Sequence, residues 1–578
     1  MDTLSLTGHR WDIKDVAPQV VHTFENTLQL HPLVAHCLAG RVQDTELARV
    51  WLRPSLDHLH DPYLIMGMQK AVERIQAAIS AGETIRIVTD YDVDGTTSSL
   101  ILQSTLRILG AGERVDYHIP DRFNEGYGFS VIAAEKAAAD GIGLIITADI
   151  GVRDHDSVDA AVAAGVDVII CDHHLPAGAS VPSAASAVLC PPQIGCGYPN
   201  KALAACGVSL KLAQALLEPH PRCGAIIRSM LKVAAIGTVA DVVDLSTREN
   251  RAIVAHGIQG LRNGTHAPGL HALLEVAGVQ GEVTSEDLGF RLGPRINAAG
   301  RLAKATSIIE LFDEREPARA RAKAQELDGL NAKRQQIQRT LVETALAQVA
   351  DPPPPFVVVW GQESEGWHRG VVGIVAAKVR DALHRPAAVI ATAGDEARGS
   401  VRSTPELHAV EALDAVQDQL SAYGGHPAAA GFSCKISDLE ALKLGLESWA
   451  EAEATGEPAA PVLSIDVRCD VGAFRSPDAD ILAQGLSDLS PHGKGNPAPV
   501  IQVDGVYVDG IKPLGEKHIR LDVGGVEAVW WNGREHTHAL TSGPVSLVGT
   551  LGYNNWRGRR SVRFTIKDAR PFSLPSPQ

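Results

Sequence analysis

Four short segments that carry aspartate lie between residues 90 and 241, and the first three directly follow apolar runs. The runs are residues 85–88, 144–146 and 166–170. Short continuous apolar runs separated by helical patterns are typical of buried parallel strands. Because open α/β sheets place their functional sites at the carboxyl ends of such strands, we expect the aspartates to gather at one edge of a parallel sheet.

A pair of histidines joins the acidic groups expected at this edge. The side chains are Asp90, Asp92, Asp94, Asp149, Asp172, His173, His174 and Asp241. Carboxylates held this close repel one another unless divalent cations lie between them. Carboxylate oxygen with some imidazole nitrogen suits Mn²⁺ or Mg²⁺ better than structural zinc. Two ions about 3.5–4 Å apart favour phosphoester or phosphoanhydride hydrolysis. The alternative is that each aspartate only caps the next helix.

Further motifs follow the aspartate segments. They are residues 120–128, 201–204, 293–301, 367–373, 399–403, 424–426 and 491–497. Together with Asp172-His173-His174 they resemble the DHH phosphoesterase superfamily and, within it, the RecJ family of bacterial single-strand-specific 5′ to 3′ DNA exonucleases. The likeness extends from about residue 56 onward, whereas the first fifty residues match only loosely. Thr89 and Asp244 depart from the family, which more often has glycine and proline there.

The resemblance implies two ions, Mn²⁺ or Mg²⁺, with Asp149 bridging them. The implied metal ligands are Asp90, Asp92, Asp94, Asp149, His173 and Asp241, and the catalytic set is Asp149, His173, His174 and Asp241. Some roles stay open. Asp90 either binds a metal or orients a ligand, and His174 either touches a metal or donates a hydrogen bond to the scissile phosphate. Asp172 either orients the two histidines or binds a metal ion.

Substrate contacts are expected from basic and small residues in the later motifs. The expected set is Arg122, Tyr127, Arg295, Asn297, Arg301, Arg398, Ser400, Arg402, Ser403, Gly425, His426 and Trp556. Residues 398–403 and 424–426 are predicted to be loops whose amides, hydroxyls and guanidinium groups hold phosphates. Tyr127 is expected to stack on a base at the strand entrance, with ordinary core packing as the alternative.

The patterning along the chain predicts an α/β architecture followed by an all-β part. A parallel-sheet DHH domain is joined by a long helix, which begins near Pro317 and ends before the prolines at 352–355, to a second, DHHA1-like α/β domain. Alternating short strands then suggest an OB-like barrel. The expected boundaries are 1–55 (N-terminal segment), 56–310 (DHH), 311–350 (connecting helix), 351–450 (DHHA1-like), 451–461 (linker) and 462–578 (OB-like).

The net charge of −15 over the whole chain, taken alone, argues against a nucleic-acid partner. A whole-chain value does not describe the charge of a local surface, however. Part of the acidity lies in the proposed metal site, where bound cations reverse the local field. Residues 512–570 carry ten Lys and Arg against five Asp and Glu. This basic stretch is either a solvated face or, with Trp556 beside Arg557, a surface on which bases stack.

Composition fits a large cytoplasmic enzyme. The chain of 578 residues has 45% apolar residues, and the start lacks the pattern of a signal peptide. The eight cysteines show no Cys-x-x-Cys spacing, so we expect reduced thiols. Because no uninterrupted apolar run reaches about 18 residues, we expect no membrane span.

These observations predict a metal-dependent, single-strand-specific 5′ to 3′ DNA exonuclease that releases 5′-mononucleotides in recombination and repair. A monomer that works with a single-strand-binding protein and a helicase is expected. One alternative is a DHH enzyme that cleaves short oligonucleotides, cyclic dinucleotides or pyrophosphate. Another is a catalytically inactive replication scaffold. The C-terminal barrel argues against the first alternative, and the intact metal segments argue against the second.

Overall fold

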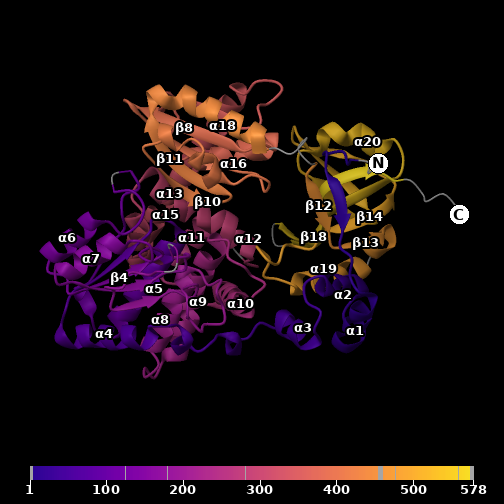
Figure 1. Cartoon of the computed structure of the whole chain (residues 1–578). Helices are drawn as coiled ribbons and strands as arrows, with labels where there is room; N and C mark the ends of the chain where they lie inside the picture. Colours follow the sequence, from indigo (N-terminus) through magenta and orange to yellow (C-terminus); the bar gives the residue numbers. More distant parts are fainter. Residues whose placement is uncertain are drawn as a thin grey trace.

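The computed structural model describes residues 4–572 except 124, 177, 179, 280, 454–459, 476, 509 and 557–558; the side chains of residues 555 and 556 are also outside the description. Figure 1 shows three folded parts: a helix-covered sheet at the lower left, a smaller sheet with helices in orange at the top, and a yellow β-sheet domain at the right.

The first part contains a five-stranded parallel sheet with the order β3-β2-β4-β5-β6. The three predicted strands before the aspartates are confirmed as β2, β4 and β5. The strands are β2 (Ile85–Thr89), β3 (Val115–His118), β4 (Leu144–Ala148), β5 (Asp167–Cys171) and β6 (Ala187–Leu189). All residues of β2 and β4 are buried, as expected for strands that are covered on both faces.

Helices cover both faces of this sheet because alternate strand residues point to opposite sides. Ile87 and Ile146 pack with four helices: α4 (Met68–Ala81), α5 (Val93–Ile108), α8 (Ala205–Leu216) and α9 (Cys223–Ala240). Ile145 and Ile170 pack on the other face with α6 (Val131–Ala139) and α7 (His155–Ala163). Helix α4 is capped at its C-terminal end by Gly82, whose φ of 74° suits glycine.

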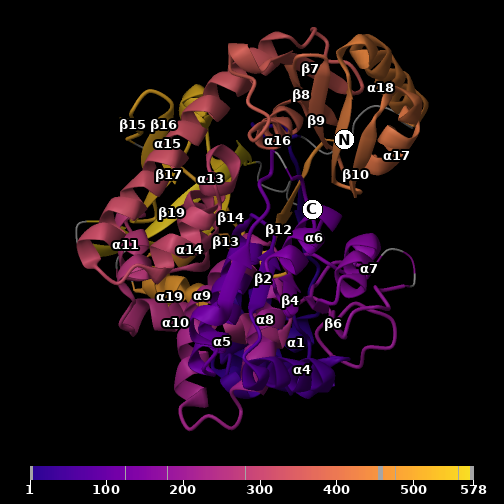
Figure 2. The ribbon, with the colours of Figure 1, turned by 90° about the vertical axis from the view of Figure 1, so that its left-hand side faces the viewer.

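A further group of helices packs beside α9 and leads to the connecting helix. Its members are α10 (Arg248–Asn263), α11 (Pro268–Val276), α12 (Ser285–Asp287), the π-helix η4 (Leu288–Leu292), α13 (Gly293–Leu302) and α14 (Thr306–Asp313). The predicted long helix is confirmed as α15 (Pro317–Ala347). Figure 2 shows α15 passing from α11 and α14 up to α16 (Val372–Leu383) in the second α/β domain.

The second α/β domain is a mixed five-stranded sheet with the order β10-β11-β9-β8-β7. Only β7 and β8 are parallel. The strands are β7 (Val357–Gln362), β8 (Ala387–Ala393), β9 (Glu396–Arg402), β10 (Ala422–His426) and β11 (Ala429–Lys435). The helices besides α16 are α17 (Ala409–Asp414) and α18 (Leu439–Glu453), so α18 runs into the segment predicted as a linker.

The loop predictions are wrong for residues 398–402, which lie in β9, and for residues 424–426, which lie in β10. Because glycine is uncommon in strands, the glycines in these segments did not indicate a strand. A Cβ at Gly399 would lie 2.2 Å from the Phe432 ring, and one at Gly425 would lie 2.4 Å from the Ala429 carbonyl. Glycine is therefore needed for packing between these strands.

The C-terminal part is an OB-like, seven-stranded sheet with the order β13-β14-β18-β19-β17-β16-β15. Among the described residues β13 and β15 form its edges, so the expected barrel is open there. The predicted alternation of short strands in this part is confirmed. The strands are β13 (Val467–Asp470), β14 (Ile501–Val506), β15 (Lys512–Leu514), β16 (His518–Val523), β17 (Val526–Trp530), β18 (Val545–Trp556) and β19 (Arg559–Pro571). The helices are α19 (Asp478–Asp488) and α20 (Thr537–Thr541).

The N-terminal segment packs on this C-terminal part (Figure 1). Strand β1 (Arg10–Ile13) pairs in parallel with β12 (Val462–Ile465). Helices α1 (Pro18–Leu28), α2 (Pro32–Ala39) and α3 (Thr45–Leu52) follow. Phe24 and Leu38 share one buried core with Phe474 and Phe564, at the other end of the chain.

Helix α9 is the one described helix that is long and apolar enough to cross a membrane. It packs against α5, α8 and α10, and Leu231, Ala234 and Ile236 are fully buried. These contacts fit a core helix. All eight cysteines are free, in agreement with the expected reduced thiols.

Arg251 on α10 joins the part that holds the parallel sheet to the C-terminal part. Its side chain is 1% exposed, and Nη2 donates to the carbonyls of Trp51 (2.9 Å), Leu489 (3.2 Å) and Ser490 (3.0 Å). The guanidinium carbon also lies 4.2 Å from the centre of the Trp51 ring. Burial and the nearby Arg41 charge lower the pKa of Arg251 to about 9.

We predict that Arg251→Ala lowers the free energy of unfolding by about 2–4 kcal/mol, because three buried carbonyls lose their donor and a void remains. Scanning calorimetry should then show the C-terminal part melting separately from the part that holds the parallel sheet. Arg248→Ala, on the same helix but exposed, is the control. A single transition at the wild-type temperature would contradict a joining role for Arg251.

Candidate metal centre

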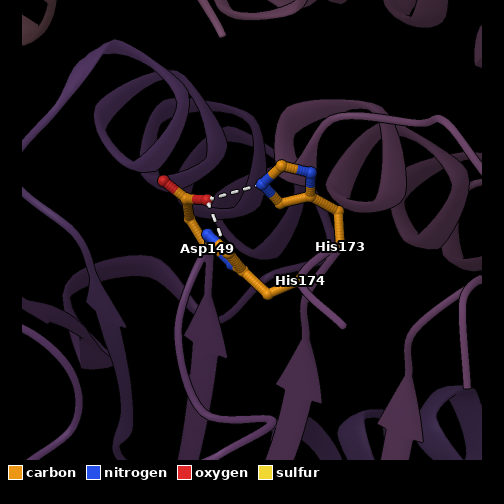
Figure 3. Close-up of side chains that lie close together, drawn as sticks. All are labelled: Asp149, His173 and His174. Atoms are coloured by element: carbon orange, nitrogen blue, oxygen red, sulfur yellow. Dashed lines mark ion pairs between the residues drawn. The ribbon is translucent and has the colours of Figure 1, made fainter. Parts of the chain in front are cut away.

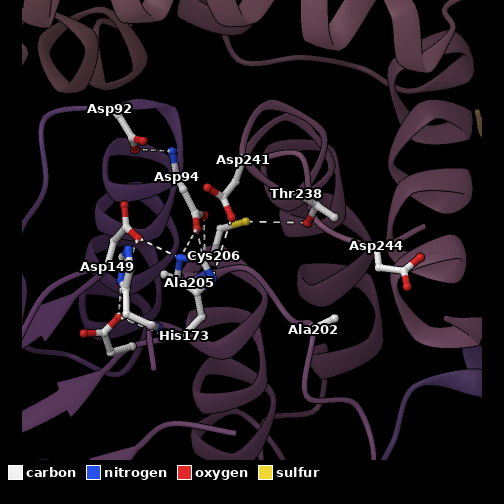
Figure 4. Close-up of polar contacts among 12 residues, drawn as sticks. Asp92, Asp94, Asp149, His173, Ala202, Ala205, Cys206, Thr238, Asp241 and Asp244 are labelled. Carbon is white, nitrogen blue, oxygen red and sulfur yellow. Dashed lines mark hydrogen bonds and ion pairs between the residues drawn. The ribbon is translucent and has the colours of Figure 1, made fainter. Parts of the chain in front are cut away.

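The turn after β2 carries three aspartates, and the chain fixes two of them with backbone amides (Figure 4). Asp92 caps α5, because its Oδ1 accepts from the amides of Asp94 (2.8 Å) and Gly95 (3.1 Å). Asp94 is fully buried, and its carboxylate accepts from the amides of Ala205 (2.7 Å) and Cys206 (2.8 Å) at the start of α8. These hydrogen bonds therefore hold the carboxylates in place and leave some oxygen lone pairs free to bind a cation.

Asp149 directly follows β4 and has a left-handed backbone conformation with φ of 67°, which is uncommon outside glycine. Its amide donates to the Cys171 carbonyl at 3.0 Å, which fixes the turn. Figure 3 shows its carboxylate facing both histidines. Oδ1 lies 3.2 Å from His173 Nε2 and 4.0 Å from His174 Nδ1. Such an outlier fits a residue that the sheet holds in place for function.

Asp172 orients the histidine pair. One oxygen accepts from the amides of His173 (2.7 Å) and His174 (3.1 Å) and from His174 Nδ1 (2.8 Å), and the other accepts from the Val152 amide (3.0 Å). Burial alone would raise the pKa of Asp172, but these bonds and the His174 charge lower it to about 2. The geometry therefore supports the orienting role over direct binding.

Asp241 completes the site from the C-terminal end of α9. Its Oδ2 lies 3.7 Å from His173 Nδ1, and Asp94 Oδ2 lies 3.9 Å from His173 Nε2. A Cβ at Gly237 would lie 2.3 Å from Thr97 Oγ1, so glycine lets this end of α9 approach α5 closely. Three overlapping groups have ligand atoms within 4.8 Å of one another: Asp90, Asp92 and Asp149; Asp149, His173 and His174; Asp94, His173 and Asp241.

The carboxylates raise one another's pKa. Burial and the Asp92 charge raise the pKa of Asp90 to about 8, and burial with the charges of Asp94 and Asp92 raises that of Asp241 to about 9. Burial and neighbouring carboxylates raise the pKa of Asp149 well above its ordinary range. Burial lowers the pKa of His173 and keeps the ring neutral, as a metal ligand must be.

Two buried atoms in this cluster lack a hydrogen-bond partner among the described residues: His173 Nε2 and Asp90 Oδ1. Buried polar atoms are normally satisfied, so such orphans call for an explanation. A divalent cation provides one, because it binds the free lone pairs and removes the repulsion between carboxylates. The donor set of carboxylate oxygen with imidazole nitrogen fits Mn²⁺ or Mg²⁺.

Tyr127 lies over the mouth of the metal centre. Its ring is 60% exposed, which does not fit the core-packing alternative. Its hydroxyl lies 3.4 Å from His174 Nε2 and 3.5 Å from the Asp149 carbonyl. Arg122 stacks on Tyr91 next to it, with 4.1 Å between the guanidinium carbon and the ring centre.

Four arginines come together beside the centre. Burial, and then the charges of Arg122, Arg334 and Arg402, lower the pKa of Arg301 to about 10. Arg301 on α13 donates to the Gly370 carbonyl at 3.1 Å, and Arg402 on β9 donates to Ser400 Oγ at 2.7 Å. None of the four forms an ion pair with a residue that the structure describes. We call these residues the arginine cluster.

A cavity of about 390 Å³ adjoins the arginine cluster. Tyr91 and Arg122 form part of its wall, and Gly300 and Lys304 at the end of α13 form another part. This hollow could receive a polar group next to the metal centre.

Other expected substrate residues lie elsewhere or are already engaged. Arg295 binds Asp328 (2.9 Å) and the Arg291 carbonyl (2.7 Å), so it ties α13 to α15. Arg398 is exposed and lies 3.8 Å from Glu396. Asn297 is half-buried on α13, Ser403 is buried, and Gly425 lies in β10. Trp556 ends β18, and its side chain is outside the described residues.

His426 at the end of β10 lies near enough to the metal centre to feel the charges of Arg153 and His174. Burial, and then the charges of Arg153 and His174, lower the pKa of His426. Arg153 follows β4, where its Nε donates to the Leu175 carbonyl at 2.7 Å. Sequence reasoning missed Arg153 and Arg334. Position after a strand could have indicated Arg153, whereas Arg334 lies in a predominantly polar stretch of α15 and gives no such signal.

Comparison with known proteins matches the three parts separately. Residues 84–238 match the DHH family, N-terminal domain; residues 354–452 match the DHHA1 domain; and residues 476–568 match the RecJ OB domain. These matches confirm the predicted order of parts.

Proteins that match nearly the whole chain indicate the same family. The chain is 36% identical over 574 residues to the single-stranded-DNA-specific exonuclease RecJ of Bacillus subtilis, covering 97% of this chain and 70% of the relative. It is similar to RecJ of Thermus thermophilus in complex with Mn²⁺ (TM-score 0.83, 29% identity, 98% of this chain and 80% of that chain). The Mg²⁺ complex of that protein gives a TM-score of 0.77 at 28% identity, with 98% and 79% covered. The motifs, the fold and these matches show that the chain belongs to the RecJ family.

Proposed function

We propose that this chain is a metal-dependent, single-strand-specific DNA exonuclease that cleaves from the 5′ end and releases 5′-mononucleotides. The observation that carries the proposal is the overlap of three potential metal-binding groups at Asp149 and His173, with two unsatisfied buried ligand atoms. The names of the relatives support the substrate class. The polarity, the products and a role in recombination and repair are part of the proposal.

Two cations would be held by Asp90, Asp92, Asp94, Asp149, His173 and Asp241. Asp149 belongs to two of the three groups, which suits a bridging ligand. When bound, Mn²⁺ or Mg²⁺ would activate water for attack and neutralise charge on the phosphate. The strained turn at Asp149 and the amides that hold Asp92 and Asp94 keep the ligands in place before substrate arrives.

His174 is assigned the role of a hydrogen-bond donor to the scissile phosphate. Its Nδ1 is engaged by Asp172, which leaves Nε2 facing the mouth of the site, 3.4 Å from the Tyr127 hydroxyl. Burial would lower the pKa of His174, but the bond to Asp172 and its charge raise it. A protonated ring would donate from Nε2 to a phosphate oxygen.

The arginine cluster is assigned to the 5′ end of the strand. Arg122, Arg301, Arg334 and Arg402 bring four positive charges together with no carboxylate partner among the described residues. A terminal phosphate carries more negative charge than an internal one and presents more oxygens. The cluster therefore favours a 5′-phosphorylated end next to the metals.

We assign the selectivity for single-stranded over double-stranded DNA to the shape of the passage that leads to the metal centre. The tip of the 120–128 segment meets the second α/β domain, where the Phe123 and His368 rings lie 5.8 Å apart and the guanidinium of Arg369 lies 4.6 Å from the Phe123 ring. A passage bounded by both domains would exclude a duplex. A single-strand-binding protein and a helicase as partners, a monomeric state and a cytoplasmic location complete the proposal.

The direct test uses purified protein, Mn²⁺ and oligonucleotides labelled at either end. Single strands should release label from the 5′ end as mononucleotide, and a 5′-phosphorylated strand should be cleaved faster than a 5′-hydroxyl strand. Blunt duplex and cyclic dinucleotides are the controls. Release of the 3′ label first, or preferential cleavage of the cyclic dinucleotide, would overturn the proposal.

Asp149→Asn should reduce kcat/KM by at least about 100-fold, about 2.7 kcal/mol, because the shared metal ligand loses its charge. The fold should survive, since Asp149 lies at the sheet edge. Calorimetry should also show lost Mn²⁺ binding. Asp159→Asn, an exposed position on α7, is the matched control. Activity above about a tenth of wild type would rule out the bridging role.

Tyr127→Ala should raise KM for single strands by about 5- to 100-fold with a smaller change in kcat, because one base–aromatic stack contributes about 1–3 kcal/mol. Tyr127→Phe keeps the ring and removes only the hydroxyl near His174, so its KM should stay near the wild-type value. Steady-state kinetics on one oligonucleotide separates the two variants. Equal KM for wild type and Tyr127→Ala would exclude stacking.

A further inference from the structure

A loop of the C-terminal part, residues 489–497, docks onto the catalytic part beside Asp241. The Lys494 carbonyl accepts from the Leu245 amide at 2.8 Å, and the His492 carbonyl accepts from Ser285 Oγ at 2.6 Å. Leu245 is the fourth residue after Asp241, and Ser285 begins α12. The loop therefore contacts the segments on both sides of this end of α9.

Both parts of the molecule hold the loop rigidly. Asn496 is fully buried, and its Nδ2 donates to the carbonyls of Leu489 (2.8 Å) and Pro491 (2.9 Å). Arg41 donates to Asn496 Oδ1 at 2.9 Å from the N-terminal segment. Gly495 has φ of 74°, and a Cβ there would overlap the Asp244 carboxylate. The backbone at Lys494 is thus fixed, whatever its side chain does.

The side chain of Lys494 has no structural partner. It is exposed, and it makes no hydrogen bond or ion pair with any residue that the structure describes. Because its own carbonyl accepts from the Leu245 amide, Lys494 lies beside the segment that follows Asp241. A fixed backbone thus presents an unpaired cation near a proposed metal ligand.

An exposed aromatic ring lies in η4, which directly follows α12, the helix whose Ser285 contacts the docked loop. Phe290 in η4 is 78% exposed. A Cβ at Gly289 would lie 3.4 Å from Val239 Cγ1, and one at Gly293 would lie 3.5 Å from the Ala240 Cβ, so η4 packs on the last turn of α9. Burying Phe290 in this chain would be favourable, yet it faces solvent next to the Asp241 turn.

We propose that Lys494 and Phe290 form a strand-binding strip that holds single-stranded DNA on the 3′ side of the cleavage site. Lys494 contacts a backbone phosphate and Phe290 stacks on a base, the two contacts from which sequence-independent single-strand binding is built. The inference rests on the proposed function. The arginine cluster includes Arg402 of the second α/β domain and receives the 5′ end. The strip, in contrast, adjoins the C-terminal part. The continuing strand therefore passes the strip.

The test measures kcat/KM with Mn²⁺ for a 5′-phosphorylated strand of about 30 nucleotides and for a 5′-phosphorylated dinucleotide, at several salt concentrations. Lys494→Ala should lower kcat/KM for the long strand about three- to fivefold at low salt and make the log–log salt slope shallower by about 0.7, the value for one lost phosphate contact. Phe290→Ala should lower it about 5- to 100-fold with an unchanged slope. The dinucleotide has one nucleoside and no further phosphate beyond the scissile bond, so it is too short to span the strip, and neither variant should affect its cleavage.

Two controls accompany these variants. Lys494→Arg keeps the charge and should retain the salt slope. Lys435→Ala removes an exposed lysine of β11 whose backbone is in register with Glu396, at the end of β9 remote from Arg402, and should change nothing.

Equal losses on the long strand and the dinucleotide would overturn the strip, because Lys494 would then act through Asp241 and not on the strand. Unchanged kinetics would overturn it as well. If the wild type cleaved neither substrate, the proposed function would fail separately, and fluorescence anisotropy of strand binding by the same variants would still test the strip through the salt slope.

Discussion

The carboxylates gathered at the edge of the β2-β4-β5 sheet repel one another, and the rest of the site is arranged around that repulsion. Parallel strands and the ends of α5 and α9 bring Asp90, Asp94, Asp149 and Asp241 together in a buried space, where their pKa values rise. The chain relieves part of the repulsion by itself: amides of α8 hold Asp94, and His174 pairs with Asp172. The negative charge that remains on the carboxylates requires positive charge nearby, and divalent cations provide it.

Positive groups surround this negative centre, and this arrangement reconciles a net charge of −15 with a polyanionic substrate. The arginine cluster lies toward the second α/β domain, and Lys494 lies toward the C-terminal part. Each group is contributed across a boundary between parts of the molecule. Relative placement of the three parts therefore decides where a strand can lie, and buried contacts such as that of Arg251 maintain this placement.

Most of the catalytic sheet could be predicted because its strands are continuous apolar runs that end in aspartate, and α15 could be predicted because prolines bound it. Strands β9 and β10 were missed because Gly399 and Gly425 are required by close packing that no local pattern reveals. Arg334 was missed because a polar helix gives no sign of which face meets a site. The N-terminal segment packs on the C-terminal part through contacts between residues more than 400 positions apart, such as Phe24 with the Phe474 core. Patterns within a short window cannot indicate such pairings.

The most direct measurement is a calorimetric titration of the metal-free protein with Mn²⁺ at pH 7 in two buffers of different ionisation enthalpy. Asp90 and Asp241, with pKa values raised to about 8 and about 9, are protonated at that pH without metal and must lose their protons to bind. We therefore expect two ions per chain, net release of protons, and affinity that increases as the pH rises toward 9. Binding of fewer than two ions without proton release would contradict the carboxylate-centred site.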